Sequence, residues 1–413
     1  MRTEACISRK TLWIVSGGIE AVPGIRRAKE LGHHVVVSDG NSNAPGFQYA
    51  DDIIVVSTYD IGGTVEEAIQ YQRERRAIDG VICIAADVPL TVANVARELN
   101  LPGISVKTAE ISSDKIVMKD KFVEMGIPVP WYSLLESLDH LCAIVRDRKG
   151  QLVIKPVDSR GARGVLRIRE SNPDLEWIYN FSLQFSPSKQ LMVEEYLEGP
   201  QISTESILLN GIGYTPGFVD RNYEYLERFA PNIIENGGQQ PSHLSAEEQH
   251  SVACLAEEAG RALGMDNGVV KGDMVLTKDG PKVIEVAARL SGGWFSTDQI
   301  PLATGVDFVG CAIRLALGEE IDPSELVPRF QKGVAIRYFF PILGVVKKIK
   351  NIEKFYNTPW IHKLHFFVKE NDVVEATTNH TKRAGLVITV GDTRDEAVLR
   401  AETVINGIEI EMV

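Results

Sequence analysis

The feature that most constrains the fold is the rhythm of the first hundred residues, where short apolar runs alternate with helical segments. The runs TLWIV, HVVV, DIIVV and GVICI read as strands, and GIRRAKELG and PLTVANVARELN read as amphipathic helices. This alternation predicts an open, mostly parallel sheet with helices on both faces. Ligands of such sheets bind beyond the carboxyl ends of the strands, where the sequence places Gly17, Gly18, Asp39 and Asp87. The same residues also suit ordinary turns, and SGG falls short of a dinucleotide-binding fingerprint.

The length and the charge of the chain limit its domain count and its partners. With 413 residues, the chain is expected to fold into two to four domains. The formal net charge is −12 and no block of basic residues stands out, so we expect no nucleic-acid partner. A local cationic cleft on an acidic protein can still bind a small polyanion.

The cysteines and the first apolar run bear on the cellular compartment. The five cysteines are scattered, with no CxxC pair and no zinc spacing with histidine, so free thiols in a reducing compartment are expected. The run TLWIVSGG is too short to span a membrane and has no signal-peptide cleavage site. We therefore expect a cytoplasmic protein with no membrane partner.

A lysine followed by a glycine-rich loop marks one candidate phosphate site. In LVIKPVDSRGARGV, Lys155 ends an apolar strand, and a loop with Gly161, Ala162 and Gly164 follows. Glycines let backbone N–H groups approach a phosphate, and a lysine supplies a point charge. The lysine precedes the loop, which is the reverse of a Walker A site. An ordinary surface hairpin with an extended lysine side chain is the competing interpretation.

The stretch MVEEYLEGPQISTES places carboxylates beside another apolar strand. Backbone groups of Glu195, Tyr196 and Leu197 can read an adenine edge from an extended chain. Gln201 and Glu205 follow at positions from which they can reach a ribose or a second group of phosphates. An exposed acidic turn is the competing interpretation, and on this stretch alone it is the preferred one.

The hairpin VVKGDMVLTKDGPKVIEVAARL carries two carboxylates whose relation depends on its turn. With a two-residue turn at 279–280, Asp273 and Glu285 lie on opposite faces. With a three-residue turn at 278–280, they lie opposite each other on one face. Facing carboxylates repel, and a Mg²⁺ ion between them removes that penalty. Arg289 then points along the same face toward a phosphate or a substrate carboxylate, unless it only forms a structural pair with Glu285.

These motifs, in this order, resemble the ATP-grasp family. The resemblance rests on SDKIVMKDKF, on the lysine and glycine loop, on EEYLEG and on GDMVL followed by KVIEVAARLSGG, and it covers most of the chain. It implies an α/β and α+β multidomain protein with an N-terminal open parallel α/β domain (1–113), an ATP-grasp domain of two subdomains (114–320) and a C-terminal mixed α/β domain (321–413). The segments GVAIRYFFP and TKRAGLVITVGDTRDEAVLRAETVI resemble the C-terminal domain of the biotin-carboxylase-like branch.

The resemblance also implies a role for each matching residue, with ATP and Mg²⁺, or Mn²⁺ in its place, as cofactors. Lysines would contact the phosphates, the glycine loop would be a mobile lid, the stretch 194–197 would hold adenine, and arginines would steady an acyl phosphate. The implied nucleotide-binding residues are Lys115, Lys155, Ser159, Gly161, Gly164, Glu194, Glu195, Tyr196, Leu197, Gln201 and Glu205. The implied metal ligands are Asp273 and Glu285, and the implied catalytic residues are Lys155, Arg289 and Arg337.

Two positions depart from the family pattern. Gln201 stands where many members carry a glutamate for the ribose, and its amide can still hydrogen-bond. Ala287 stands where most members carry the asparagine of an E-x-N motif, and an alanine side chain cannot ligate a metal. Either one magnesium ion is bound by fewer protein ligands, or another group compensates, with Ser291 as the candidate. The alanine–arginine version of this strand resembles the bacterial L-amino-acid ligases.

The resemblance implies an ATP-dependent carboxylate–amine ligase that acts on small molecules. A carboxylate would attack the γ-phosphate to give an acyl phosphate and ADP, and an amine, best taken as that of an amino acid, would then displace phosphate. Purine-biosynthesis, carbamoyl-phosphate and biotin-carboxylase-type enzymes are the alternatives within the family. A nucleotide-binding regulatory protein without ligase activity is the alternative outside it. We also expect a homodimer.

The irregular segment from residue 220 to 245 is too long for a tight turn. It carries Arg221, Glu235, Gln239 and His243. Long loops of this kind are usually functional or mobile, so the segment is expected to border the substrate pocket.

Overall fold

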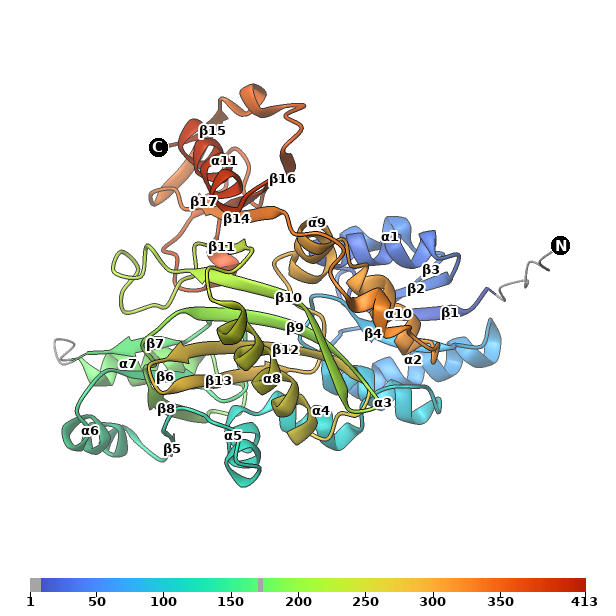
Figure 1. The fold of residues 1–413 in the computed structure, drawn as a ribbon, viewed down its shortest axis with the longest axis horizontal. Helices are drawn as coiled ribbons and strands as arrows, with labels where there is room; N and C mark the ends of the chain where they lie inside the picture. The colour runs from blue at the N-terminus through green and yellow to red at the C-terminus, as the bar shows by residue number, and fades with distance from the viewer. Residues whose placement is uncertain (1–8, 170–173) are drawn as a thin grey trace.

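The N-terminal part of the chain folds into a parallel four-stranded sheet. The computed structural model describes residues 9–169 and 174–413. In spatial order the strands are β3 (Asp52–Val55), β2 (His34–Asp39), β1 (Thr11–Val15) and β4 (Gly80–Cys83). The helices beside them are α1 (Val22–Glu30), α2 (Ile61–Glu74) and α3 (Pro89–Glu98). Every residue of the central strand β1 is buried, and the open parallel sheet expected from the sequence is confirmed (Figure 1).

Two consecutive helices lead from this sheet into the next region. α4 (Val106–Ser113) is followed directly by α5 (Lys115–Glu124). The side chain of Asp114 accepts hydrogen bonds from the N–H groups of the second and third residues of α5. These donors have no partner within a helix, which is why an aspartate is favoured there. This cap places Lys115 at the first helical position.

A small antiparallel sheet forms the next region. Its strands, in spatial order, are β5 (Tyr132–Leu135), β8 (Leu191–Glu195), β6 (Leu152–Pro156) and β7 (Leu166–Ile168). Helices α6 (Leu138–Asp147) and α7 (Leu175–Gln184) bury Leu141 and Ile178 in the same apolar cluster as the strands. This region lies at the opposite end of the molecule from the parallel sheet (Figure 1).

An eight-stranded antiparallel sheet runs through the rest of the molecule. Its strands, in spatial order, are β13 (Gly280–Ala287), β12 (Gly268–Thr277), β9 (Gln201–Leu209), β10 (Ile212–Asn222), β11 (Gly237–Gln240), β14 (Gly333–Phe339), β18 (Gly385–Gly391) and β16 (Ile361–Phe366). The C-terminal strands continue this sheet through the pairing of β14 with β11. α8 (Ala246–Ala262) packs on β12 and β13, and α11 (Arg394–Gly407) packs on β14 and β18.

The remaining elements are short. A three-stranded sheet consists of β17 (Val373–Val374), β15 (Gly344–Lys350) and β19 (Glu409–Met412). The single turns are η1 (Ile19–Ala21), η2 (Pro45–Tyr49), η3 (Phe295–Gln299), η4 (Pro323–Leu326), η5 (Ile352–Phe355) and η6 (His380–Lys382). Across the described part of the chain, no helix combines the length and the apolar character that a membrane span requires.

Helices α9 (Ile300–Thr304) and α10 (Phe308–Ala316) return to the N-terminal sheet (Figure 1). Phe308 and Ile313 are fully buried in one apolar cluster with Leu12 and Ile25. The domain boundaries predicted from the sequence placed these helices in the central domain, because their apolar pattern does not reveal which sheet they cover. Their burial joins them to the N-terminal core, and the predicted domain boundaries stay predictions.

Candidate active site

The hairpin of β12 and β13 brings two carboxylates face to face. Its turn consists of Lys278 and Asp279 alone, and a bulge at Ile284 shifts the register by one residue, so that Asp273 pairs with Glu285. Opposed residues of an antiparallel ladder point to the same face of the sheet. The predicted pairing is confirmed, but both turns considered from the sequence are wrong, because neither included a bulge.

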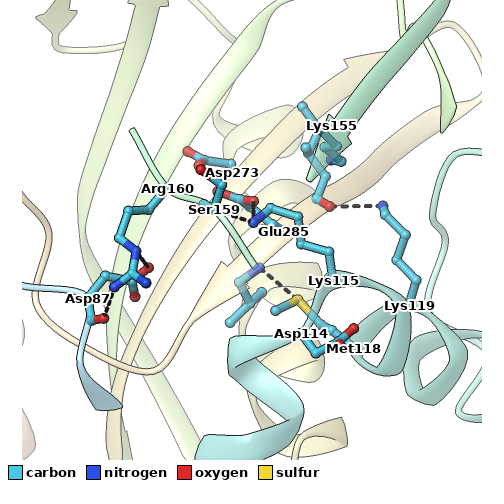
Figure 2. A network of polar contacts seen from close by, with 12 residues as sticks. Asp87, Asp114, Lys115, Met118, Lys119, Lys155, Ser159, Arg160, Asp273 and Glu285 are labelled. Atoms are coloured by element: carbon cyan, nitrogen blue, oxygen red, sulfur yellow. Dashed lines mark hydrogen bonds and ion pairs between the residues drawn. The ribbon is translucent and has the colours of Figure 1, made fainter. Parts of the chain in front are cut away.

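Lys115 lies beside this carboxylate pair. Its Nζ is 3.7 Å from Oε2 of Glu285 and donates a hydrogen bond to the carbonyl of Ser159 at 2.6 Å (Figure 2). Its backbone N–H donates to the carbonyl of Val157 at 3.0 Å, which fixes the start of α5 to the strand end before the glycine loop. The structure therefore brings a predicted phosphate-binding lysine, the lid and a predicted metal ligand together.

Lys155, the second predicted lysine, ends in a buried ion cluster. Its Nζ lies 2.6 Å from one carboxylate oxygen of Glu194, and Nζ of Lys119 lies 3.0 Å from the other. All three side chains are 5% exposed or less. Burial alone would raise the pKa of Glu194, but the two ammonium groups outweigh it and lower that pKa. Two cations around one anion leave a net positive charge, which suits a phosphate.

Lys119 was missed by the sequence reasoning. Its Nζ also donates to the carbonyl of Ile284, the bulged residue, at 2.9 Å. Burial lowers the pKa of Lys119 to about 8, against the opposing effect of Glu194. Lys119 therefore connects the buried ion cluster to the bulge that sets the register of Glu285. The available signal was its position one helical turn after Lys115, on the same face of α5.

The strand end at 194–197, predicted to hold adenine, has two of its donors in use. The N–H groups of Glu195 and Tyr196 donate to backbone carbonyls of the protein at 2.8 and 3.0 Å. The predicted adenine contact would therefore use other backbone groups of this stretch, because the carboxylate of Glu194 holds the lysines. Gln201 opens β9 next to Val275 of β12. Its predicted contact with a ribose stays a prediction.

The glycine loop adopts a conformation that favours glycine. Gly161, Ala162 and Gly164 have φ angles of +64°, +59° and +71°. At Gly164 a Cβ atom would lie 3.0 Å from the carbonyl oxygen of Ser182, so a larger residue there would collide with backbone. The glycines of this loop therefore suit its left-handed backbone conformation.

Contacts from the N-terminal and the C-terminal regions hold this loop over the site. Arg160 donates to the carbonyl of Asp87 at 2.8 Å, and its guanidinium lies 4.6 Å from the ring centroid of Tyr59. The carbonyl of Gly161 accepts a hydrogen bond from the N–H of His380, in η6, at 3.1 Å. The loop is therefore in a closed position.

Arg289 reaches from the end of β13 to the carboxyl end of β4. Its Nε donates to Oδ1 of Asp87 at 3.2 Å. The other oxygen of Asp87 is 3.8 Å from Nε of Arg160 (Figure 2). Burial would raise the pKa of Asp87, but Arg289 and Arg160 outweigh it and lower that pKa. One carboxylate thus holds the predicted catalytic arginine and the lid arginine together, where ligands of parallel sheets bind.

The glycines after Arg289 face the N-terminal domain. The N–H of Gly293 donates to Oε2 of Glu20, in η1 just after β1, at 2.8 Å. Burial raises the pKa of Glu20, although the hydrogen bond from Gly293 and nearby arginines oppose that shift. On the other side, the guanidinium of Arg383 lies 3.7 Å from the ring centroid of Tyr338. Neither Glu20 nor Arg383 was predicted as a site residue, although Arg383 lies in the segment TKRAGLVITVG that resembles the family's C-terminal domain.

Asp273 is surrounded by positive charge. Its Oδ1 accepts from the hydroxyl of Ser203 at 2.9 Å and lies 3.1 Å from Arg221, while Lys271 contacts its Oδ2. Burial would raise the pKa of Asp273, but Lys271 and Arg221 outweigh it and lower that pKa. Nε of Arg221 also donates to Glu235 at 2.7 Å. Arg221, from the segment expected to border the substrate, therefore contacts a predicted metal ligand, and Glu235 of the same segment holds Arg221.

Arg337 does not belong to this site. Its guanidinium donates to the carbonyls of Gly238 and Ile336 at 3.3 and 3.0 Å and lies 3.9 Å from Glu402 of α11. Neighbouring residues of a strand point to opposite faces, so Tyr338, and not Arg337, is directed toward Arg383 and the glycines. The predicted catalytic role of Arg337 is corrected for this reason.

Glu205 and Ser291 are directed away from the nucleotide and the metal ligands. Glu205 is fully buried, and its Oε1 accepts from the N–H of Ser291 at 2.8 Å and from the hydroxyl of Ser296 at 2.5 Å. Burial raises the pKa of Glu205 to about 7. The predicted nucleotide contact of Glu205 is corrected, because no surface of its side chain is left for a ligand. Ser291 lies in the same buried cluster and does not replace the missing ligand at Ala287.

The carboxylate pair suits a magnesium ion that is also bound by phosphates. Mg²⁺ is usually held by one or two protein carboxylates, substrate phosphates and water. Asp273 and Glu285 supply two hard oxygen donors on one face, and the cations around them show how strongly this place favours positive charge. Within residues 9–169 and 174–413, no group of three or more His, Cys, Asp or Glu side chains could hold a metal by itself.

Models of three protein domains match the chain in the order of its regions. The ATP-grasp N-terminal domain matches residues 25–103, the ATP-grasp domain matches residues 112–293, and the L-amino acid ligase C-terminal domain 2 matches residues 337–413. Together these matches run from the parallel sheet, through the carboxylate hairpin and Arg289, to the end of the chain.

Individual proteins are similar over long stretches. The chain is 31% identical to a D-alanine–D-alanine ligase of Gloeobacter violaceus over 225 residues, which are 51% of this chain and 70% of the ligase. It is 25% identical to the uncharacterized protein y4rH of Sinorhizobium fredii over 412 residues, covering 95% of this chain and 81% of y4rH. Its fold is similar to that of the L-amino acid ligase from Bacillus licheniformis, with a TM-score of 0.83, 20% identity, and coverage of 98% of this chain and 99% of the ligase.

Proposed function

We propose that this chain, which belongs to the ATP-grasp family of ATP-dependent, ADP-forming ligases, joins a carboxylate to the amine of an amino acid through an acyl phosphate. Membership of the family carries the ATP-dependent ligase activity and the use of small carboxylate and amine substrates. The choice of an amino acid is the finer proposal. It is supported by the match of the C-terminal domain and by the amino acids in the names of the similar ligases.

One observation carries the proposal: a single closed loop connects the phosphate-binding end of the site with the arginine end. Ser159 of the loop accepts from Lys115, beside the carboxylate pair, and Arg160 of the same loop meets Asp87, which orients Arg289. A carboxylate at Arg289 and a γ-phosphate at Lys115 would thus be enclosed under one lid. Enclosure and orientation of two reactants are what phosphoryl transfer requires of a protein.

The first step forms the acyl phosphate. A carboxylate oxygen of the substrate attacks the γ-phosphorus of ATP, and the bond to the bridging oxygen breaks, which leaves ADP. Lys115 and Lys155 carry the positive charge for the phosphates, and Arg289 orients the carboxylate. Fixed charges of this kind stabilise the transition state because they are in place before the reaction.

The second step forms the amide. The nitrogen of the amine attacks the carbonyl carbon, the carbon–oxygen bond to the phosphate breaks, and the nitrogen releases a proton. Arg289 would hold the departing phosphate, and the closed loop would exclude water that hydrolyses the acyl phosphate. No covalent bond to the protein is needed in either step.

Glu285 is the residue proposed to hold Mg²⁺, with Asp273 facing it across the hairpin. The ion would neutralise charge on the phosphates of ATP when bound. Lys115, 3.7 Å from Glu285, would keep that carboxylate oriented toward the ion. The homodimer and the cytoplasmic location stay predictions.

Release of ADP with amino acids tests this function. Purified protein with ATP and MgCl₂ is assayed with single amino acids and with all pairs of them, and the proposal expects ADP release that requires at least one amino acid. Glu285→Gln removes a proposed metal ligand and is expected to reduce the rate about 10²–10³-fold, as for loss of one charge-stabilising group. Lys278→Gln, at the exposed turn of the same hairpin, is the matched control and should retain the wild-type rate.

The other outcomes separate the alternatives. ADP release with bicarbonate or with purine precursors alone would assign the chain to another branch of the family. Tight binding of ATP with no ADP release from any substrate would favour a regulatory, nucleotide-binding protein.

A further inference from the structure

The position that lacks a metal ligand lies directly across the hairpin from a lysine. In the ladder of β12 and β13, Ala287 pairs with Lys271, and two residues along, Glu285 pairs with Asp273. The ladder is regular between these two pairs, since the bulge lies on the other side of Glu285. Alternation along each strand therefore directs the four side chains to one face. The methyl group of Ala287 leaves space on this face beside the carboxylate pair.

The side chain of Lys271 turns toward the carboxylate of Asp273 on its own strand. Its Nζ contacts Oδ2 of Asp273, and Arg221 lies 3.1 Å from the other oxygen of the same carboxylate. The side chains of Lys271 and Asp273 are only 15% and 8% exposed, so water screens their attraction poorly. A divalent cation on Oδ2 would have to share one oxygen with an ammonium group, which like-charge repulsion opposes.

We propose that Lys271 takes the place of a second divalent cation, so that this chain holds one such ion with ATP instead of two. An asparagine at position 287 would add a ligand for a second ion. This chain instead has an alanine there and a fixed positive charge on the opposite strand. The charge needed beside Asp273 and the phosphates is then supplied by an ammonium group, which requires no further protein ligand.

The remaining ion would depend on Glu285 and on the phosphates of ATP. Glu285 is 34% exposed, and its ion pair with Lys115 is long, at 3.7 Å, so its carboxylate is accessible to an ion. Ser291, the other candidate to compensate for Ala287, donates its N–H to Glu205 and lies in a buried cluster. Ala287 thus lacks the metal ligand that an asparagine would provide, and Lys271, opposite it, provides a positive charge in place of the second ion.

Counting bound Mn²⁺ tests this inference without any turnover. The full chain is saturated with the non-hydrolysable analogue AMP-PNP and titrated with Mn²⁺, and free Mn²⁺ is measured by electron paramagnetic resonance. We expect one Mn²⁺ per chain in the wild type and in the turn control Lys278→Met. Ala287→Asn alone should still bind one, because the ammonium group is in place. Lys271→Met combined with Ala287→Asn should bind two.

The number of Mn²⁺ ions bound by each variant decides whether the inference holds. Two ions in the wild type, two in Ala287→Asn alone, or one in a folded double variant would overturn the inference. The wild-type count decides by itself if the double variant does not fold. The inference rests on the proposed use of ATP, so an absence of AMP-PNP binding would overturn both. A wild-type count of two, by contrast, overturns this inference and leaves the ligase proposal standing.

Discussion

The two ends of the site are built in different ways. At the lysine end, Lys119, Lys155 and Glu194 are buried together between α5 and the small sheet, and each carboxylate oxygen has its own cation. At the arginine end, Arg289 and Arg160 share Asp87, whose side chain is 31% exposed, and the three residues come from three distant segments. The lysine end is therefore formed by the fold itself. The arginine end is complete only when the loop is closed.

The largest expected effect is on the stability of the lysine end. Glu194→Gln leaves two buried lysines without their anion, and loss of one partner of a buried pair costs about 3–5 kcal/mol. Urea denaturation should show a loss of this size in the free energy of unfolding. Adding Lys119→Met to Glu194→Gln removes one of the unpaired charges and should recover part of it. A loss below about 1 kcal/mol for Glu194→Gln would mean that the cluster is not buried in solution.

The arginine end should show the reverse: a large effect on rate and a small one on stability. Asp87→Asn keeps the size of the side chain but removes the charge that orients Arg289. We expect kcat/KM to fall about 100-fold, the usual cost of a misplaced catalytic group, while the free energy of unfolding changes by less than about 1 kcal/mol, as for partly exposed pairs. An equally large loss of stability would show that Asp87 is a structural residue and would remove the contrast between the two ends.

The dependence of stability on pH distinguishes the buried carboxylates beneath the two ends. Because the pKa of Glu205 is raised from 4.5 to about 7, the folded chain keeps a proton there that the unfolded chain has lost. Its contribution to the free energy of unfolding is therefore full below pH 4.5 and is lost as the pH rises toward 7. Glu194, with a lowered pKa, acts with the opposite sign: its contribution is present above pH 4.5 and is lost at more acidic pH.

Glu205→Gln isolates this effect. The neutral amide oxygen can still accept from Ser291 and Ser296, so the variant should match the wild type near pH 5 and exceed its free energy of unfolding at pH 8 by about 1–3 kcal/mol. Urea denaturation at pH 5, 6.5 and 8 measures the difference. A constant difference across this range would show that Glu205 does not change its charge there.

The smallest expected effect concerns the loop. Arg160→Ala removes the contacts with Asp87 and Tyr59 but leaves the hydrogen bonds at Ser159 and Gly161. A partly exposed ion pair contributes about 0–1 kcal/mol, so KM for ATP should rise no more than about fivefold. Limited proteolysis should show faster cleavage within 158–165 in the variant. Arg163→Ala, in the same loop, is the matched control. An equal increase in cleavage in both variants would contradict a specific role of Arg160 in holding the loop closed.

Sequence reasoning predicted the secondary-structure elements and motifs better than the features that depend on strand register. The parallel sheet follows from periodicity, and the ATP-grasp fold follows from the resemblance that the motif order carries. The pairing of Asp273 with Glu285 was one of two alternatives, and the chain reaches it through a turn that the sequence did not indicate. The bulge at Ile284 has no sequence signature, because a lysine on a different element stabilises it. Side chains alternate between the two faces of β14, so a shift of one residue decides whether Arg337 or Tyr338 faces the site.

The partners of buried side chains were equally hard to predict. Glu194 and Glu205 look alike in an apolar strand, yet one meets two ammonium groups and the other meets a hydroxyl and a backbone N–H. Those partners come from segments up to 91 residues away, and only the folded chain brings them together. The role of Lys271 was equally hard to predict, because it depends on Ala287, the residue opposite it in the ladder.

Transfer of oxygen from the substrate to phosphate tests directly whether the reaction passes through an acyl phosphate. The chain is supplied with ATP, MgCl₂, an accepted amine and a carboxylate substrate labelled with ¹⁸O in both oxygens, and the phosphate released is analysed by ³¹P nuclear magnetic resonance. An acyl phosphate passes one labelled oxygen to each phosphate, so we expect the released phosphate to contain one ¹⁸O atom. Amide formation with unlabelled phosphate would contradict it, because the carboxylate would then have been activated by another route.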